Sequence, residues 1–358
     1  MKTVLSFYLF ASLLLLATSC GGAKKTPAEP SAATSLAAPV DIAFSSDSAY
    51  AFCQAQCDFG PRTMNSEAHE RCGQWIVDKF QSYGLHVIEQ RATLKGFDGT
   101  PLLSNNIIAS YRPDLADRVL VCAHWDSRPW ADNDPDPANH SKPVMAANDG
   151  ASGVAVMLEL ARLISGSERR AERAEPADAD ETSPTSGAEA NAQPSTFNPQ
   201  LGIDFICFDA EDWGDDGYSD SWALGAQHWA KNLHKPGYKA RFGILLDMVG
   251  GQQARFCCEG YSLYYAPQVV KRVWRAAEEA GYSSYFPRED GGTITDDHVP
   301  VNEVAKIPCI DIIPYYPLCE QSSFGPTWHT VNDDMQHIDR STLKAVGQTL
   351  VQVIFTEK

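Results

Sequence analysis

Four short segments of this 358-residue chain are apolar at nearly every position, and they constrain the fold more than any other feature. A strand without a polar face must be covered on both sides, which is typical of a parallel sheet packed between helices. Helix-like patterns separate the segments, as expected for strands joined by helical crossovers. The sequence therefore predicts an α/β fold with a mostly parallel mixed central sheet flanked by helices on both faces. The segments are RVLVCAH (118–124), LGIDFICFDA (201–210), RFGILLDMVG (241–250) and IPCIDIIP (307–314).

Further helices and strands are predicted around these segments. Apolar residues at helical spacing, from Ala68 to Tyr83, predict a helix that stops at Gly84, a residue suited to the turn after a helix. Strands are predicted at 86–94, where polarity alternates, and at 104–111. Later helices are predicted at 150–164, 222–233, 267–281 and 341–355.

The first residues are predicted to be a targeting segment outside the fold. Lys2 precedes an apolar run from Val4 to Ala17 that is shorter than the roughly 20 residues that span a bilayer, so we expect a signal peptide over 1–19. LATSC resembles a bacterial lipobox, which implies cleavage before Cys20 and lipidation of its thiol. A flexible tether over 20–45 and a folded domain over 46–358 follow. We expect the protein in the bacterial cell envelope, in the periplasm or on the outer membrane, with a soluble secreted protein as the alternative.

A polar segment at about 166–196 interrupts the predicted domain. It is nearly devoid of large apolar residues and cannot bury enough surface to offset the entropy of ordering. We predict a disordered insertion, and a functional lid is the alternative.

Charge and cysteine content narrow the partners further. The formal net charge of −17 disfavours nucleic acid and anionic membrane surfaces, which are bound mainly through Lys and Arg. Membrane contact is therefore expected only through the lipid anchor. Cys122, Cys207 and Cys309 lie in apolar strands and are predicted to be buried free thiols, while the pairing of the other cysteines after Cys20 stays open.

Side chains that can bind metal follow the predicted strands, where an open parallel sheet binds its ligands. Taken singly, each has a simple structural explanation. Together they place two histidines and several carboxylates at one end of the sheet, and these are ligands that zinc accepts, with one position left for water or substrate. A glutamate beside a ligand can then act as general base. The residues are His124, Asp126, Asp149, Glu211, Asp212, Asp247 and His329.

Six motifs resemble, in order, those of the zinc aminopeptidase superfamily: AHWDS, ANDGASGVAVMLELAR, DAEDWG, LGAQHWA, LLDMVG and WHTVNDD. The resemblance runs from about Ala51 to the C-terminus, apart from the polar insertion. Within it, HWDSRPWADNDP, TDDHVPV and PTWHTVNDD are most similar to glutaminyl-peptide cyclotransferases, the single-zinc branch found in animals and bacteria.

The resemblance implies a role for each matching residue. Asp149, Asp212 and His329 become the ligands of a single zinc ion, and Glu211 becomes the general acid and base. Asp247, Asp297 and His298 are implied to form a hydrogen-bonded set beside the metal. His124, Asp126 and Asp209 are expected to support the site without binding the ion. Trp125, Trp213 and Trp328 are expected to form the walls of the substrate pocket, and a place in the hydrophobic core is the alternative for them.

Two further expectations accompany the resemblance. Many relatives have Glu-Glu where this chain has Glu211-Asp212, and the shorter Asp stem puts the coordination geometry in question. The resemblance also implies a cis peptide bond between Asp149 and Gly150.

The predicted activity is cyclisation of an N-terminal Gln of peptides or proteins to pyroglutamate, with release of ammonia. The first alternative is a two-zinc aminopeptidase, in which His124 and Asp247 join Asp149 around a second ion. A hydrogen bond from Asp297 to Asp247 would hold Asp247 away from a metal and would therefore disfavour the aminopeptidase. The second alternative is a non-catalytic binding protein on the same scaffold.

Overall fold

The computed structural model describes residues 36–174, 200–218 and 220–357. The predicted signal peptide, Cys20, the first part of the predicted tether and most of the predicted polar insertion lie outside the described residues. None of the helices in the described part of the chain has the length and apolar character needed to cross a membrane.

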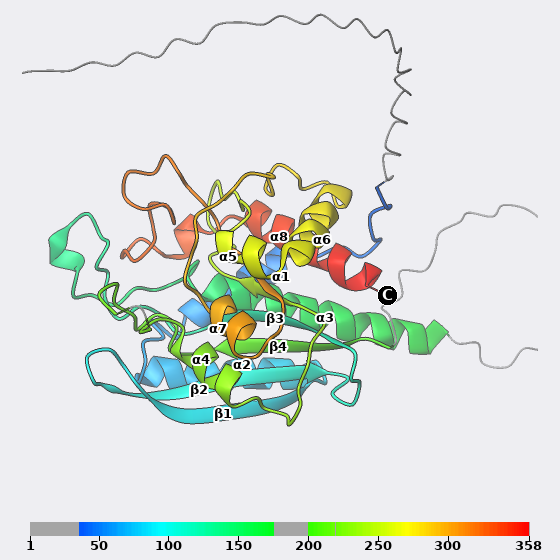
Figure 1. Ribbon diagram of the computed structural model, residues 1–358, viewed down its shortest axis with the longest axis horizontal. Helices are drawn as coiled ribbons and strands as arrows, with labels where there is room; N and C mark the ends of the chain where they lie inside the picture. The colour runs from blue at the N-terminus through cyan, green and yellow to red at the C-terminus, as the bar shows by residue number, and fades with distance from the viewer. Residues whose placement is uncertain (1–35, 175–199, 219, 358) are drawn as a thin grey trace, which may run out of the picture. The chain divides into compact units, whose positions relative to one another are not determined.

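The centre of the fold is a six-stranded sheet with the order β1-β2-β4-β3-β5-β6 (Figure 1). β1 pairs antiparallel with β2, and β2 pairs antiparallel with β4, whereas β4, β3, β5 and β6 run parallel to one another. This confirms the predicted mixed, mostly parallel sheet. The strands are β1 (His86–Lys95), β2 (Pro101–Tyr111), β3 (Arg118–His124), β4 (Gly202–Phe208), β5 (Gly243–Leu246) and β6 (Cys309–Ile312).

Both faces of the sheet are covered, and the strands alternate between two cores. Val119 and Val121 of β3 contribute to the larger core, while Leu120 and Cys122 point into the smaller one. The larger core is built with α1 (Ser46–Cys57), α2 (Glu67–Ser82), α3 (Ala151–Ala174), α6 (Pro267–Glu279) and α8 (Arg340–Thr356). The smaller core is built with α4 (Leu224–Lys231) and α7 (His298–Glu303). The short helix α5 (Gly260–Tyr265) leads into α6.

The strand order creates a topological switch point at the carboxyl end of β3. After β3 the chain adds β4 on one side, and it then crosses over to add β5 on the other side of β3. Such a reversal opens a crevice beyond the carboxyl ends of the strands, where α/β proteins bind ligands. The loops after β3, β4 and β5 therefore define the place to look for a site.

Two boundaries differ from the prediction. Residues 36–45 are not a free tether, because Phe44 is buried and its backbone N–H bonds the side chain of Gln348 in α8. Helix α3 continues to Ala174, into the predicted insertion, because the sequence SERRAERA consists mostly of good helix formers.

The cysteines after Cys20 are all free thiols in the described chain. Cys122, Cys207 and Cys309 are fully buried, as predicted. Burial raises the pKa of Cys72 to about 12, so this thiol is a core residue and not a nucleophile.

Candidate metal centre and active site

Three predicted ligands meet beyond the carboxyl ends of β3 and β4. His329 Nε2 lies 3.1 Å from Oδ1 of Asp212 and 3.7 Å from Oδ2 of Asp149. One ligand atom from each residue lies within 4.8 Å of the other two, and all three residues are buried. Neither carboxylate oxygen of Asp212 has a hydrogen-bond partner. Buried carboxylate oxygens normally have partners, so this donor set fits a bound cation, and His with two carboxylates suits zinc.

A second group of possible ligands shares Asp149 with the first. It consists of Asp149, His124 and Asp247, again with ligand atoms within 4.8 Å of one another. Here one pair is already bonded, since His124 Nε2 lies at hydrogen-bond distance, 2.9 Å, from Asp149 Oδ1, whereas Asp247 Oδ1, 3.3 Å from the same nitrogen, is buried without a hydrogen-bond partner. A second metal ion would need His124 Nε2 as a ligand, and this nitrogen is directed at the carboxylate of Asp149.

Asp149 is held in place by a carboxylate from the segment that carries His329. Asp333 is buried, and its two oxygens accept the backbone N–H groups of Asn148 at 2.7 Å and Asp149 at 3.0 Å. Gly150 follows with φ +99°, and a Cβ there would approach the carbonyl oxygen of Asp126 at 2.9 Å. Only glycine therefore fits beside this ligand. The Asp149–Gly150 peptide bond is trans, contrary to the cis bond that the resemblance implied; trans is the form favoured by about 2.5–4 kcal/mol outside proline.

Asp126 holds the backbone of the pair Glu211-Asp212. Its two oxygens accept the N–H of Glu211 at 3.1 Å and the N–H of Asp212 at 3.2 Å. The preceding Ala210 has φ +53°. Left-handed backbone at a residue other than glycine costs of order 1–3 kcal/mol and tends to occur at functional sites. His329 itself (φ +53°) and Met248 after Asp247 (φ +52°) share this conformation.

Glu211 lies in a cavity of about 390 Å³ beside the ligands. Asp149, His329 and Asp247 also line this cavity, together with Asp296. The aromatic and aliphatic part of the wall comes from Trp222, Ile313, Phe324 and Trp328. The cavity thus combines an apolar wall with a group of ionisable side chains, the usual composition of an enzyme active site.

Burial and crowding change the ionisation of these side chains. Burial, and next the charge of Asp296, raises the pKa of Glu211 well above its usual range. Burial raises the pKa of Asp247 to about 8, with Asp296 and Asp149 adding to the effect of burial against the hydrogen bond from His124. Burial would also raise the pKa of Asp149, but the hydrogen bond from His124 together with the charges of His124, His329 and Arg128 outweighs burial, and the pKa is lowered. Asp149 is therefore an ionised ligand beside a carboxyl group that readily holds a proton.

Several predicted site residues lie elsewhere than expected. Trp125 is fully buried in the larger core, where its ring stacks on His69, so it does not line the cavity. Trp213 packs against Trp130 and its Nε1 bonds Asp98, outside the residues that line the cavity. Trp328 does line it, as predicted.

The set implied for Asp247, Asp297 and His298 does not form. Both carboxylate oxygens of Asp297 are buried without a hydrogen-bond partner, and His298 Nε2 lies 3.2 Å from Glu259. Asp247 instead contacts His124. Asp209 bonds His69 at 2.8 Å and the N–H of Asn105 at 2.6 Å, so it anchors the loop that leads to Glu211.

Sequence reasoning missed Asp296, Trp222 and Phe324. Asp296 stands next to the predicted Asp297, and the motif TDDHVPV did not distinguish the two carboxylates. Trp222 and Phe324 lie in loops without regular periodicity, and only their place before a helix or a ligand could have drawn attention to them.

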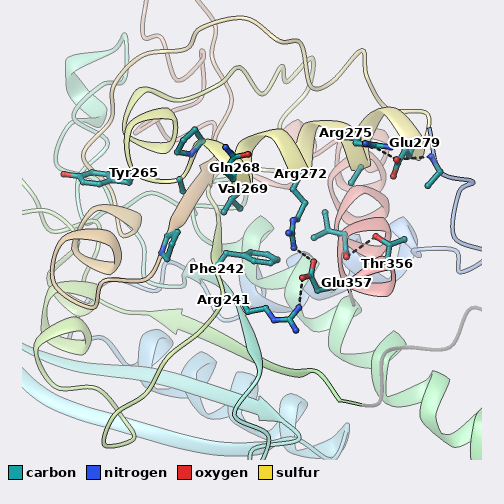
Figure 2. A pocket seen from close by; sticks show the side chains of 16 residues that line it. Arg241, Phe242, Tyr265, Gln268, Val269, Arg272, Arg275, Glu279, Thr356 and Glu357 are labelled. Carbon is teal, nitrogen blue, oxygen red and sulfur yellow. Dashed lines mark hydrogen bonds and ion pairs between the residues drawn. The ribbon is translucent and has the colours of Figure 1, made fainter. Parts of the chain in front are cut away.

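A larger cavity, of about 930 Å³, lies near the amino ends of β5 and β6 (Figure 2). It is lined by α6, α8 and the residues just before β5 and β6, such as Phe242 and Pro308. Its arginines are paired: Arg241 and Arg272 contact Glu357, and Arg275 contacts Glu279. None of the predicted metal ligands lies here, so size alone does not identify the functional site.

Comparison with known proteins agrees with this geometry. The family model of peptidase family M28 matches residues 106–354. The chain belongs to this family. The match includes every ligand and carboxylate of the site, and it confirms the resemblance to zinc aminopeptidases. An M28 fold with the donor set described above is consistent with zinc.

Solved structures of other proteins resemble the chain over nearly their whole length. A glutaminyl cyclase of Bacteroides thetaiotaomicron has a TM-score of 0.77 and 46% identity, and the match covers 88% of this chain and 99% of that chain. A structure described as a leucine aminopeptidase precursor from the same species has a TM-score of 0.77 and 45% identity, with 90% and 100% coverage. An aminopeptidase of Bacillus subtilis is 27% identical over 281 residues, which are 75% of this chain and 48% of the aminopeptidase. The chain thus spans about half the length of that relative.

Proposed function

We propose that this M28 protein is a zinc-dependent glutaminyl-peptide cyclotransferase, which converts an N-terminal Gln of peptides or proteins to pyroglutamate. The observation that carries the proposal is the contrast between the two ligand groups. Both carboxylate oxygens of Asp212 are buried without a hydrogen-bond partner, whereas in the other group this holds for one oxygen of Asp247 and His124 is bonded to Asp149. This contrast favours a single metal held by Asp149, Asp212 and His329. The likeness to a bacterial glutaminyl cyclase over 99% of its length supports the same reading.

Ring closure needs one proton to move between two nitrogens. The α-amine forms a bond to the side-chain amide carbon, the bond from that carbon to the amide nitrogen breaks, and ammonia leaves without consumption of water. Glu211 lies in the cavity beside the ligands and can take the proton from the amine and return it to the leaving nitrogen. A zinc ion bound by the three ligands would supply Lewis-acid polarisation of the amide carbonyl.

The neighbouring carboxyl groups prepare Glu211 for this task. Asp296 and Asp297 raise its pKa together with burial, so that Glu211 can hold the transferred proton. Asp247 lines the same cavity and is placed to accept a hydrogen bond from the substrate amine. Trp222, Phe324 and Trp328 enclose the Gln side chain and limit the access of water.

A two-metal aminopeptidase is the second candidate function. The group of His124, Asp149 and Asp247 favours it, because these ligand atoms are also within reach of one ion. The likeness to a leucine aminopeptidase precursor at 45% identity points the same way. Binding of a second ion would require His124 to give up its bond to Asp149.

One experiment separates the two functions. The purified protein is assayed for zinc content and incubated with a Gln-initiated peptide and with the same peptide initiated by Ala. We expect a single zinc per chain and loss of ammonia from the Gln peptide alone, detected by mass spectrometry. Release of a free N-terminal residue with two zinc ions per chain would instead establish the aminopeptidase.

We also propose that the protein acts in the bacterial cell envelope, anchored through a lipid on Cys20. The motif LATSC after a short apolar run supports this location. Growth with a labelled fatty acid should label the wild-type chain and not Cys20→Ser. Equal labelling of both would disprove the anchor.

A further inference from the structure

Arg128 lies behind the metal ligands with its guanidinium fully engaged. Only 4% of the residue is exposed. Its Nε and Nη2 donate to the two oxygens of Asp132 at 3.0 and 2.6 Å, and Nη1 donates to the backbone carbonyls of Asp212 at 3.0 Å and Gly214 at 2.9 Å. One side chain therefore connects the loop after β3 with the loop that carries Asp212.

Asp132 extends this connection to a second ligand. Its Oδ1 lies 3.6 Å from Nδ1 of His329, on the side of the imidazole opposite the nitrogen that faces Asp212. At 3.6 Å the two atoms are too far apart for a hydrogen bond, so Asp132 acts on the ring through its charge. Carboxylate partners behind a metal-binding histidine often contribute 10–100-fold to metal affinity. The bidentate bond from Arg128 holds Asp132 in the position for this role.

The same guanidinium also supports the wall of the cavity. It lies over the ring of Trp222, 4.9 Å from its centroid, and Trp222 stacks in turn on His329 with ring centroids 6.1 Å apart. Trp222 and Asp132 thus lie near the face and the Nδ1 of His329, and Arg128 contacts both of them.

We propose that Arg128 is a positioning residue of the metal centre, which sets the geometry of Asp212 and His329 without touching metal or substrate. The proposal rests on the proposed metal site but not on the reaction. Its effect depends on the planar fork of arginine, since a lysine ammonium cannot bond both oxygens of Asp132 and two carbonyls together. This connection also offers an account of how the shorter Asp212 is kept within reach of the ion.

The test is the substitution Arg128→Lys, with Arg118→Lys as matched control. Arg118 is equally buried and also makes a bidentate bond to an aspartate, Asp204, at 2.6 and 2.7 Å, and it bonds backbone carbonyls as well. It lies at the amino end of β3, away from the ligands. Both variants lose comparable packing and bonds, so the control measures the purely structural cost.

Zinc affinity is measured by chelator competition, and the unfolding temperature is measured on the metal-free proteins. We expect Arg128→Lys to weaken zinc binding by about 10–100-fold, while Arg118→Lys leaves it within about threefold of wild type and lowers the unfolding temperature at least as much. Asp132→Asn should weaken zinc binding too, with little added loss in the double variant, because the two residues act together.

Unchanged affinity in Arg128→Lys, or an equal loss in Arg118→Lys, would overturn the proposal. Failure to observe cyclisation would leave these affinities, and hence the proposal, intact.

Discussion

Glu211 and Asp212 face different surroundings because consecutive side chains diverge from the backbone. Glu211 lines the cavity, whereas Asp212 faces His329. The side chain of Asp212, one methylene shorter than a Glu, still reaches His329, since its Oδ1 is 3.1 Å from His329 Nε2. Asp126 bonds both backbone N–H groups and so fixes the two directions together.

Glu211→Gln should separate metal binding from turnover. The amide keeps the size of the side chain but cannot carry the proton, so we expect kcat to fall at least about 100-fold, with zinc content unchanged. Steady-state kinetics and metal analysis test this. Asp220→Asn, in the same segment but exposed, is the control and should behave as wild type. Full activity of Glu211→Gln would exclude Glu211 as the acid and base.

His329→Ala should lose zinc affinity and activity together. The imidazole is the only nitrogen donor of its ligand group, and its removal leaves two carboxylates to hold the ion. Metal titration of the apoprotein tests this, with His337→Ala as a control because His337 is about two-fifths exposed and bonds only its neighbour Asp334. An active variant with full zinc content would show that another histidine binds the metal.

The site residues that the sequence identified are those at strand ends, and the errors have a common physical cause. Alternate residues of a strand face opposite ways, so once His124 points toward Asp149, Trp125 must point into the core on the other side. The ends of the strands thus predict the positions of the metal ligands but not the residues that form the wall of the cavity. Trp222 and Phe324 come from loops, whose course depends on tertiary contacts.

Among the elements, the strands and the helices α2, α3, α4, α6 and α8 were predicted, whereas α1, α5 and α7 were missed. The helix predicted to stop at Gly84 is α2, which ends at Ser82 with Gly84 at φ +86°. Helix α1 was missed because its buried face carries Gln56 and cysteines instead of large aliphatic residues. Helices α5 and α7, with six residues each, are too short to show a periodicity.

Helix α4 packs so closely on the loop before Glu211 that only glycine fits at the contact. A Cβ at Gly225 would lie 2.0 Å from the carbonyl oxygen of Asp209. We expect Gly225→Ala to destabilise the protein by about 1–3 kcal/mol or more and to reduce activity by moving that loop. Gly166→Ala in α3 meets nothing within 4 Å and should be stabilising by about 0.5–1 kcal/mol. Chemical denaturation measures both, and equal stability of the two variants would contradict the close contact.

For the molecule as a whole, the site concentrates buried negative charge in a chain that is already acidic. Five carboxyl groups line one cavity, the buried ones of Asp149, Glu211, Asp247 and Asp296 and the exposed one of Asp216. Their mutual repulsion is reduced by protonation in the metal-free protein and by a dication in the loaded one. Stability, metal and pH should therefore be linked.

The metal-free protein should lose stability as pH rises. In the folded state the pKa of Asp247 is raised to about 8, whereas in the unfolded chain it is near the usual value of about 4. Between these values the folded state binds more protons than the unfolded state, so the free energy of unfolding decreases with increasing pH. His124 acts in the same direction: burial would lower its pKa, but Asp126, Asp149 and Asp247 raise it well above its usual range.

Denaturation of the chelator-treated protein from about pH 5 to about pH 8 tests this linkage, and Asp247→Asn should reduce the slope. Zinc should reverse the trend, since its ligands must be deprotonated to bind and the stabilisation by zinc should grow with pH. A metal-free protein whose stability is constant or rises across this range would show that Asp247 is ionised in the folded state. The repulsion between the carboxylates would then be reduced by something other than a proton bound to Asp247.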